Sequence, residues 1–172
     1  MRTLETRYAL ALYELTRDEE GLRSGASLLM DKAELWQALL NPCIPAREKD
    51  GVLCRLLQGR LPQVHLDFFR LLCRRERLAL LPGILTCFHQ LKLEGEGGAV
   101  AVYRCAREPD PQDLDRIGEV LKRRHGLSKV EFQVEVIPEL LGGFTIQIGG
   151  ITYDKSVRGM LGGLRRSLKE RE

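Results

Sequence analysis

Residues 138–168 read PELLGGFTIQIGGITYDKSVRGMLGGLRRSL and predict a strand, a tight turn, a second strand and a helix. Apolar Phe144, Ile146 and Ile148 alternate with polar residues, which is typical of a strand with one buried face. The glycine pair at 149–150 follows, and glycine accepts the positive φ that a tight hairpin turn requires. The stretch therefore predicts an antiparallel hairpin near the end of the chain.

The remainder of this stretch predicts an amphipathic helix with its own cap. Asp154 and Ser156 each carry a side-chain oxygen at the point where the helix would begin. Behind them the apolar residues recur at helical spacing, namely Val157, Leu161, Leu164 and Leu168. No histidine stands nearby in the sequence to act as a base, so we interpret Asp154 and Ser156 as helix caps and not as catalytic residues.

Composition excludes several classes of protein. The 172 residues are 44% hydrophobic and 30% charged, so the chain is expected to fold into one average domain or two small ones. The net charge of +3 is too slight for the basic footprint of a nucleic-acid-binding protein. We find no apolar run near the roughly 20 residues of a membrane span. Because acidic residues stand near Met1 and no small-residue cleavage site follows an apolar core, we expect neither a signal peptide nor a transit peptide.

No constellation of residues predicts a metal, a cofactor or a catalytic site. Five cysteines, an odd number without close pairs, argue against both a disulfide framework and a zinc site. The three histidines, at 65, 89 and 125, lack a metal-binding spacing. Lys155-Ser156 is not preceded by the glycine loop that a phosphate site needs. We therefore expect a protein that is not an enzyme and holds no cofactor.

A glycine-rich connection at residues 95–98 divides the chain. Residues 1–94 carry helical patterns only, and these predict a six-helix bundle. The helices are expected at 3–17, 20–30, 32–40, 45–59, 62–76 and 78–93. Residues 99–172 mix strands and helices, which predicts a small mixed-sheet α/β domain that ends in the amphipathic helix.

In the second part, alternation predicts two further strands around one helix. Residues 99–105 place Ala99, Ala101 and Tyr103 on one face, and residues 130–136 place their four apolar side chains on one face. Residues 113–125 form the intervening helix. A strand–helix–strand unit implies a parallel pair, to which the later hairpin adds antiparallel pairing.

The first and fifth expected helices carry more apolar residues than one core-facing stripe needs. In the first, Leu4, Tyr8, Ala11, Leu12 and Leu15 are expected to face the core, while Ala9, Leu10 and Tyr13 lie off that stripe. In the fifth, Val64, Phe68, Leu71 and Leu72 are expected to face the core, while Phe69 and Cys73 lie elsewhere. The pattern supports equally a central place in the bundle and a groove for a partner's helix.

The residues of 142–164 resemble the carboxy-terminal motif of the delta subunit of F-type ATP synthases, called oligomycin-sensitivity-conferring protein in mitochondria. The matching positions are Gly142, Gly143, Gly149, Asp154, Ser156, Val157, Arg158, Gly159, Leu161 and Leu164. Two departures are Lys155, where the family usually has glycine, and the pair Gly162-Gly163, where charged helix formers are common. The stretches RYALALYEL, LLNPCIPAREK and FFRLLCRRERLALLPGI resemble earlier motifs of the family.

The resemblance implies a non-catalytic stator subunit that links the catalytic head to the peripheral stalk. It implies a six-helix amino-terminal bundle whose first and fifth helices bind the amino-terminal helix of an alpha subunit, which favours the groove. The carried-over contact residues are Tyr8, Ala11, Leu12, Leu15, Phe68, Phe69 and Leu72. The second domain would meet the b subunits, with one copy per complex, at the cytoplasmic face of a bacterial membrane and without insertion into it.

Two questions stay open at this point. Gly159, Gly162 and Gly163 each disfavour a helix, and they indicate either the close approach of another backbone or an end that orders on binding. The alternative function is a small RNA-binding or other adaptor module, which would want exposed aromatic residues on its sheet. Co-purification with head and stalk subunits, against a salt-dependent shift of nucleic acid, distinguishes the two functions.

Overall fold

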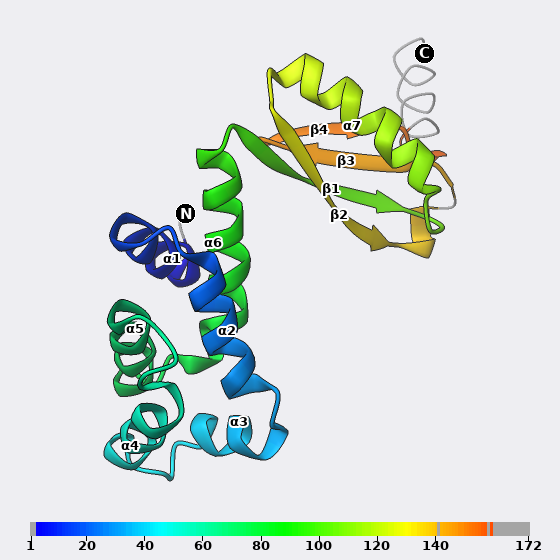
Figure 1. Cartoon of the computed structure of the whole chain (residues 1–172). Helices are drawn as coiled ribbons and strands as arrows, with labels where there is room; N and C mark the ends of the chain where they lie inside the picture. The colour runs from blue at the N-terminus through cyan, green and yellow to red at the C-terminus, as the bar shows by residue number, and fades with distance from the viewer. Residues whose placement is uncertain (1–2, 141, 158, 160–172) are drawn as a thin grey trace. The chain divides into compact units, whose positions relative to one another are not determined.

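The computed structural model describes residues 3–140, 142–157 and 159 (Figure 1). The chain divides into two compact units, Met1–Lys92 and Leu93–Glu172. The first unit is helical, and the second contains a four-stranded sheet with one helix on it. This confirms the predicted class, in which helices alone precede a small domain with a mixed sheet.

The helices of the first unit lie close to their predicted positions. They are α1 (Leu4–Leu15), α2 (Glu19–Met30), α3 (Ala33–Leu40), α4 (Ala46–Leu57), α5 (Gln63–Arg74), the 3-10 helix η1 (Leu78–Leu80) and α6 (Leu81–Gly95). The first five begin and end within two residues of the predicted bounds. The predicted helix at 78–93 differs, because its first turn is a separate 3-10 helix and the α-helix begins only at Leu81.

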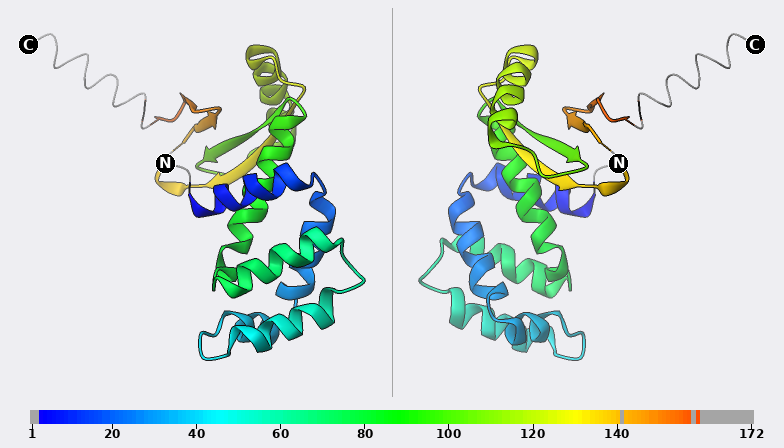
Figure 2. Two further views of the ribbon diagram at one scale, coloured as in Figure 1. Left: turned by 90° about the vertical axis from the view of Figure 1, so that its left-hand side faces the viewer. Right: turned by 90° about the vertical axis from the view of Figure 1, so that its right-hand side faces the viewer.

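One hydrophobic core holds the first unit together, and every one of its α-helices contributes to it. The largest fully buried apolar side chains are Leu12, Leu22, Leu29, Leu53, Leu57, Phe69, Leu72, Leu81, Ile84 and Phe88. Figure 2 shows the same helices from two opposite sides. Small residues let the helices approach: a Cβ on Gly25 of α2 would collide with the Phe69 ring of α5.

A buried histidine joins α5 to the start of α2. His65 is fully buried, and its Nε2 donates a hydrogen bond to the Asp18 carbonyl oxygen at 2.9 Å. The Asp18 carboxylate in turn accepts from the Gly21 N–H at 3.0 Å and caps α2. His65 therefore has a structural role at this helix junction.

The second unit contains β1 (Gly98–Cys105), α7 (Pro111–His125), β2 (Lys129–Val136), the 3-10 helix η2 (Pro138–Leu140), β3 (Phe144–Ile148) and β4 (Ile151–Asp154). The strand order in the sheet is β2-β1-β3-β4. Strands β1 and β2 are parallel and are connected through α7, whereas β3 runs antiparallel to both β1 and β4. The predicted parallel pair and hairpin are both confirmed.

Helix α7 covers one face of this sheet (Figure 1). The buried core below it contains Ala101, Tyr103, Cys105, Leu121, Ile146 and Ile148. Apart from Leu121, which belongs to α7, these residues follow the alternation that the sequence predicted for β1 and β3. In β2 the prediction holds only for Val130 and Phe132, because Val134 and Val136 lie toward the end of the strand and are 39% and 52% exposed.

The glycine-rich connection between α6 and β1 is held by hydrogen bonds from Ser128 within the second unit. The Ser128 N–H donates to the Gly97 carbonyl at 2.9 Å, and the Ser128 hydroxyl donates to the Glu96 carbonyl at 2.9 Å. Gly97 has a φ of 76°, which favours glycine at this turn. The division into residues 1–94, 95–98 and 99–172, with a flexible middle, stays a prediction.

Candidate partner-binding surfaces

Helix α1 turns a different face to the core from the one that the sequence predicted. Its buried residues are Ala9 and Leu12, with exposures of 0% and 1%. Leu4 and Leu15, which were expected in the core, are 44% and 74% exposed, and Ala11 is also exposed. The expected core stripe of this helix was therefore wrong at Leu4, Ala11 and Leu15.

The same correction applies to α5. Phe69, Leu72 and Cys73 are buried in the core at 2% exposure or less, although Phe69 and Cys73 were expected to lie off the core stripe. Val64 and Leu71, which were expected inside, are 40% and 43% exposed. Both helices thus carry a second apolar stripe that the core does not cover.

The two exposed stripes lie next to each other. The Tyr8 ring of α1 packs edge-on against the Phe68 ring of α5, with 6.3 Å between the ring centroids. The Tyr8 hydroxyl accepts a hydrogen bond from Arg77 Nη1 at 2.7 Å, and the Arg77 guanidinium lies over the same ring. Tyr8 is half-buried as a result, and it connects the α1 stripe to the α5 stripe.

We call this combined surface the α1/α5 face; it consists of Leu4, Tyr8, Ala11, Leu15, Val64, Phe68 and Leu71. On each helix the members are spaced by three or four residues, which is the spacing of one helix face. An apolar face of this kind fits the apolar side of an amphipathic helix from another protein.

The structure divides the seven predicted contact residues into two groups. Tyr8, Ala11 and Leu15 lie on the α1/α5 face and are accessible, and Phe68, at 8% exposure, lies at its floor. Leu12, Phe69 and Leu72 are buried in the core, so in this structure their side chains cannot touch a partner. Sequence reasoning missed Leu4, Val64 and Leu71 as surface residues because it placed them in the core.

The carboxy-terminal motif residues gather around the β3–β4 hairpin and the chain that follows it. Gly149 and Gly150 form the hairpin turn with φ values of 54° and 80°, as predicted. Gly143 has a φ of 73°, and a Cβ there would collide with the Lys155 carbonyl oxygen. The Val157 N–H donates to the Gly142 carbonyl at 3.0 Å. The glycine pair at 142–143 therefore lets two backbone segments pack directly together.

Asp154 and Ser156 make the hydrogen bonds of a helix cap. The Ser156 hydroxyl accepts from the Gly159 N–H at 3.0 Å and donates to Asp154 Oδ1 at 2.7 Å. The Ser156 N–H also donates to Asp154 Oδ1, at 2.8 Å. The hydroxyl and backbone hydrogen bonds from Ser156 hold the pKa of the Asp154 carboxyl below its usual range. Both residues thus orient the start of the terminal segment.

Two residues of this motif, Gly159 and Lys155, lie within the described part of the chain. A Cβ on Gly159 would collide with the Asp154 carboxylate, so this glycine makes room for a side chain of the same chain. Among the described residues only Glu76 combines a side chain with positive φ, so Lys155 occupies the usual glycine position without that strain. Outside the described residues lie Arg158 and the predicted terminal helix beyond Gly159, with Leu161, Gly162, Gly163 and Leu164.

The described residues show few features of other kinds of site. Within 3–140, 142–157 and 159, no group of three His, Cys, Asp or Glu side chains is placed to hold a metal ion. No helix in that part of the chain is long and apolar enough to cross a membrane. Cys73 and Cys105 are buried, and burial raises the pKa of both thiols, so both act as small apolar residues of the two cores.

Comparisons with known proteins cover nearly the whole chain. A family model described as the ATP synthase delta (OSCP) subunit matches residues 4–168. The chain is 32% identical to the ATP synthase subunit delta of Methylobacillus flagellatus, over 97% of each chain. It is 33% identical to the chloroplastic ATP synthase subunit delta of Emiliania huxleyi, over 90% of this chain and 89% of the relative. A chain in the structure of the Toxoplasma gondii mitochondrial ATP synthase hexamer shares the fold, with a TM-score of 0.71, 20% identity, and coverage of 96% and 97%.

Proposed function

The chain belongs to the ATP synthase delta (OSCP) subunit family, and on this basis we propose how it links two parts of the enzyme. It is a non-catalytic, structural subunit of ATP synthase with a stator role. We propose that the first unit binds the amino-terminal helix of an alpha subunit, and that the second unit binds the b subunits of the peripheral stalk. The chain then keeps the catalytic head from turning with the rotor, so that proton flow drives ATP synthesis.

The single observation that carries the head-side proposal is the α1/α5 face. Seven side chains on two adjacent helices form one largely apolar surface, of which only Phe68 also belongs to the buried core. An amphipathic helix that covered this face would remove Leu4, Leu15, Val64 and Leu71 from water. Burial of that apolar area is the expected source of the affinity.

The site residues that we propose for the alpha-subunit helix therefore differ from the seven carried over by resemblance. Tyr8, Ala11, Leu15 and Phe68 remain in the proposed contact. Leu12, Phe69 and Leu72 support it from inside by fixing α1 and α5 in place. Leu4, Val64 and Leu71 join the contact because they extend both stripes on the exposed side.

On the stalk side, we propose that the motif of residues 142–164 positions the segment that contacts the b subunits. Gly142, Gly143, Asp154, Ser156 and Gly159 fix the direction in which the chain leaves the sheet. The segment after Gly159, which contains Leu161 and Leu164, would then present its apolar residues to the b subunits. We place the protein at the cytoplasmic face of a bacterial membrane, with one copy per complex.

A truncation after Gly159 tests the stalk-side proposal. It keeps the Ser156 cap and the whole sheet, so we expect the shortened chain to fold and still bind the head. Membranes that carry it should hydrolyse ATP while pumping fewer protons and synthesising less ATP. The matched control replaces Val120, an exposed apolar residue of α7, with glutamine. Coupling unchanged by the truncation would remove the terminal segment from the stalk contact.

A further inference from the structure

A cavity of about 240 Å³ opens between the end of α3, helix α4, the end of α5 and η1. Its walls are mainly apolar and come from Leu39, Leu40, Pro42, Leu78 and Ala79. None of these residues belongs to the α1/α5 face or to the carboxy-terminal motif. The cavity is therefore separate from both surfaces of the proposed function.

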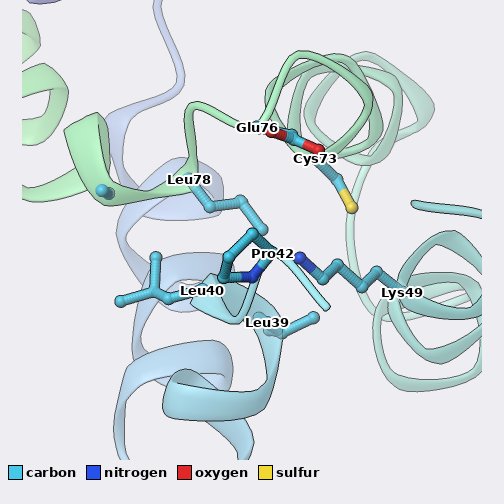
Figure 3. A pocket seen from close by; sticks show the side chains of 8 residues that line it. Leu39, Leu40, Pro42, Lys49, Cys73, Glu76 and Leu78 are labelled. Carbon is cyan, nitrogen blue, oxygen red and sulfur yellow. The ribbon is translucent and has the colours of Figure 1, made fainter. Parts of the chain in front are cut away.

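A buried lysine points into this cavity. Lys49 of α4 is only 5% exposed, and Figure 3 shows its amino group directed toward Pro42 on the opposite wall. Within the described part of the chain, the side-chain ammonium of Lys49 makes no hydrogen bond and no ion pair. The neighbouring carboxylate is already engaged, because Asp50 binds Arg70 at 2.8 Å and Arg74 at 3.4 Å.

The other polar groups of the cavity do not neutralise Lys49. Burial raises the pKa of the Cys73 thiol, and the nearby Lys49 charge acts in the opposite direction without overcoming it. Cys73 is therefore a neutral thiol at physiological pH. Glu76 lines the cavity but is exposed, and among the described residues it forms no ion pair with Lys49. The ammonium group thus lacks a counter-charge.

The Lys49 side chain is largely buried, while its ammonium reaches the open cavity. A cation that faces mainly apolar walls without a counter-charge is unfavourable, and an anion that enters the cavity would offset that cost. The space is smaller than the roughly 300–1,000 Å³ of sites for drug-sized ligands. Apolar walls around one cation fit a carboxylate on a short aliphatic stem better than a phosphate, which would leave several oxygens against leucine and proline. We propose that this cavity binds one aliphatic carboxylate group, with Lys49 as its counter-ion.

Two sources supply this chemistry: a small free carboxylic acid, or the acidic side chain of another chain in the assembled enzyme. The first test uses the isolated full-length chain and isovalerate as the probe. Amide signals of Leu39, Leu78 and Ala79 are followed by NMR during the titration. We expect saturable shifts with isovalerate, and binding at least tenfold weaker for isovaleramide, which has the same shape without the charge.

Variants test whether isovalerate binds in this cavity. Lys49→Met keeps the length of the side chain and removes the charge, and it should weaken isovalerate binding at least tenfold. Lys32→Met removes an exposed lysine outside the cavity and should leave binding unchanged. If Lys49→Met does not fold, Ala79→Phe fills the cavity while Lys49 stays, and it should abolish the shifts.

The second test locates the natural source. In the assembled ATP synthase, a carbodiimide joins an amine to a carboxylate that touches it. A crosslink that is present in the wild type and lost in Lys49→Met identifies an acidic side chain of a partner. Isovalerate binding without such a crosslink identifies a free acid. If isovalerate does not saturate the isolated chain and no Lys49-dependent crosslink forms, or if isovaleramide binds as tightly as isovalerate, the proposal is wrong.

Discussion

Replacing Leu15 with glutamine tests whether the α1/α5 face binds a partner. Leu15 is the last residue of α1 and is 74% exposed, so the core does not depend on it. Glutamine is chosen because it is neutral and favours helix about as well as leucine. Aspartate at this position would also place a negative charge at the carboxy-terminal end of α1, where it interacts unfavourably with the helix dipole. Its effect on binding would then combine the charge with the lost apolar contact.

The expected loss of binding free energy follows from the exposed fraction of the Leu15 side chain. Complete burial of a leucine side chain contributes about 1.5–3 kcal/mol relative to leaving it exposed. Leu15 is 74% exposed, so a covering helix has about three quarters of that, roughly 1–2 kcal/mol, still to gain. Since about 1.4 kcal/mol corresponds to a tenfold change, Leu15→Gln should weaken binding by roughly 5- to 30-fold. The free energy of unfolding should change by no more than about 0.5 kcal/mol.

The assay is a calorimetric titration of the full-length chain with a peptide of the alpha-subunit amino-terminal helix, together with urea unfolding of each variant. Two control variants are measured in the same two assays. Val120→Gln, at a 55% exposed position of α7, should change neither quantity. Leu12→Ala removes a buried side chain and should cost about 2–5 kcal/mol of stability. If Leu15→Gln binds the peptide as tightly as the wild type, the proposed face is not the binding site.

Two further predictions concern stability. Gly143→Ala should destabilise the chain by about 1–3 kcal/mol, because its φ of 73° and the Lys155 carbonyl both exclude a Cβ. The control Gly51→Ala, in the open middle of α4, should stabilise the chain by about 0.5–1 kcal/mol. If the two substitutions have the same effect in thermal unfolding, the close packing at 142–143 is contradicted. The hydrogen bonds from Arg70 hold the pKa of Asp50 below its usual range, so this carboxylate stabilises the fold above its unfolded pKa, near 3.8. Asp50→Asn should therefore be less stable than the wild type at pH 7, and the difference should shrink as the pH falls through the lowered value; a difference independent of pH would contradict the ion pair.

The elements that the sequence predicts well are those set by local rules. The glycine pair at 149–150 forms the turn because few other residues accept positive φ, and β1 and β3 alternate because one sheet face meets α7. The helices of the first unit were predictable because their apolar residues recur at helical spacing. Prolines 45 and 62 stand directly before α4 and α5 and indicate where these two helices begin.

The orientation of α1 and α5 could not be predicted in the same way. A face that fills a core and a face that binds a partner have the same helical period, so a helix with both carries two equivalent stripes. On α1 the outer stripe, from Leu4 to Leu15, is longer and more regular than the inner pair Ala9 and Leu12. The choice between them depends on which neighbours pack against the helix, and this is long-range information.

Gly159 was ambiguous for a related reason. Its neighbour is the Asp154 carboxylate, five positions earlier, and the contact exists only because the chain turns at Ser156 to begin a helix. Periodicity describes which side of a helix a residue occupies. It does not describe a side chain that folds back from the preceding strand. The sequence therefore indicated either the close approach of another backbone or an end that orders on binding, and it missed this contact within the chain.

We propose that one copy of this chain binds the head and the stalk at the same time, through different units. Native mass spectrometry of the full-length chain, mixed with the alpha-subunit peptide and a soluble fragment of the b subunits, tests it directly. We expect a ternary complex that contains one copy of the chain. Two binary complexes that exclude each other, or a chain that binds neither component, would contradict it.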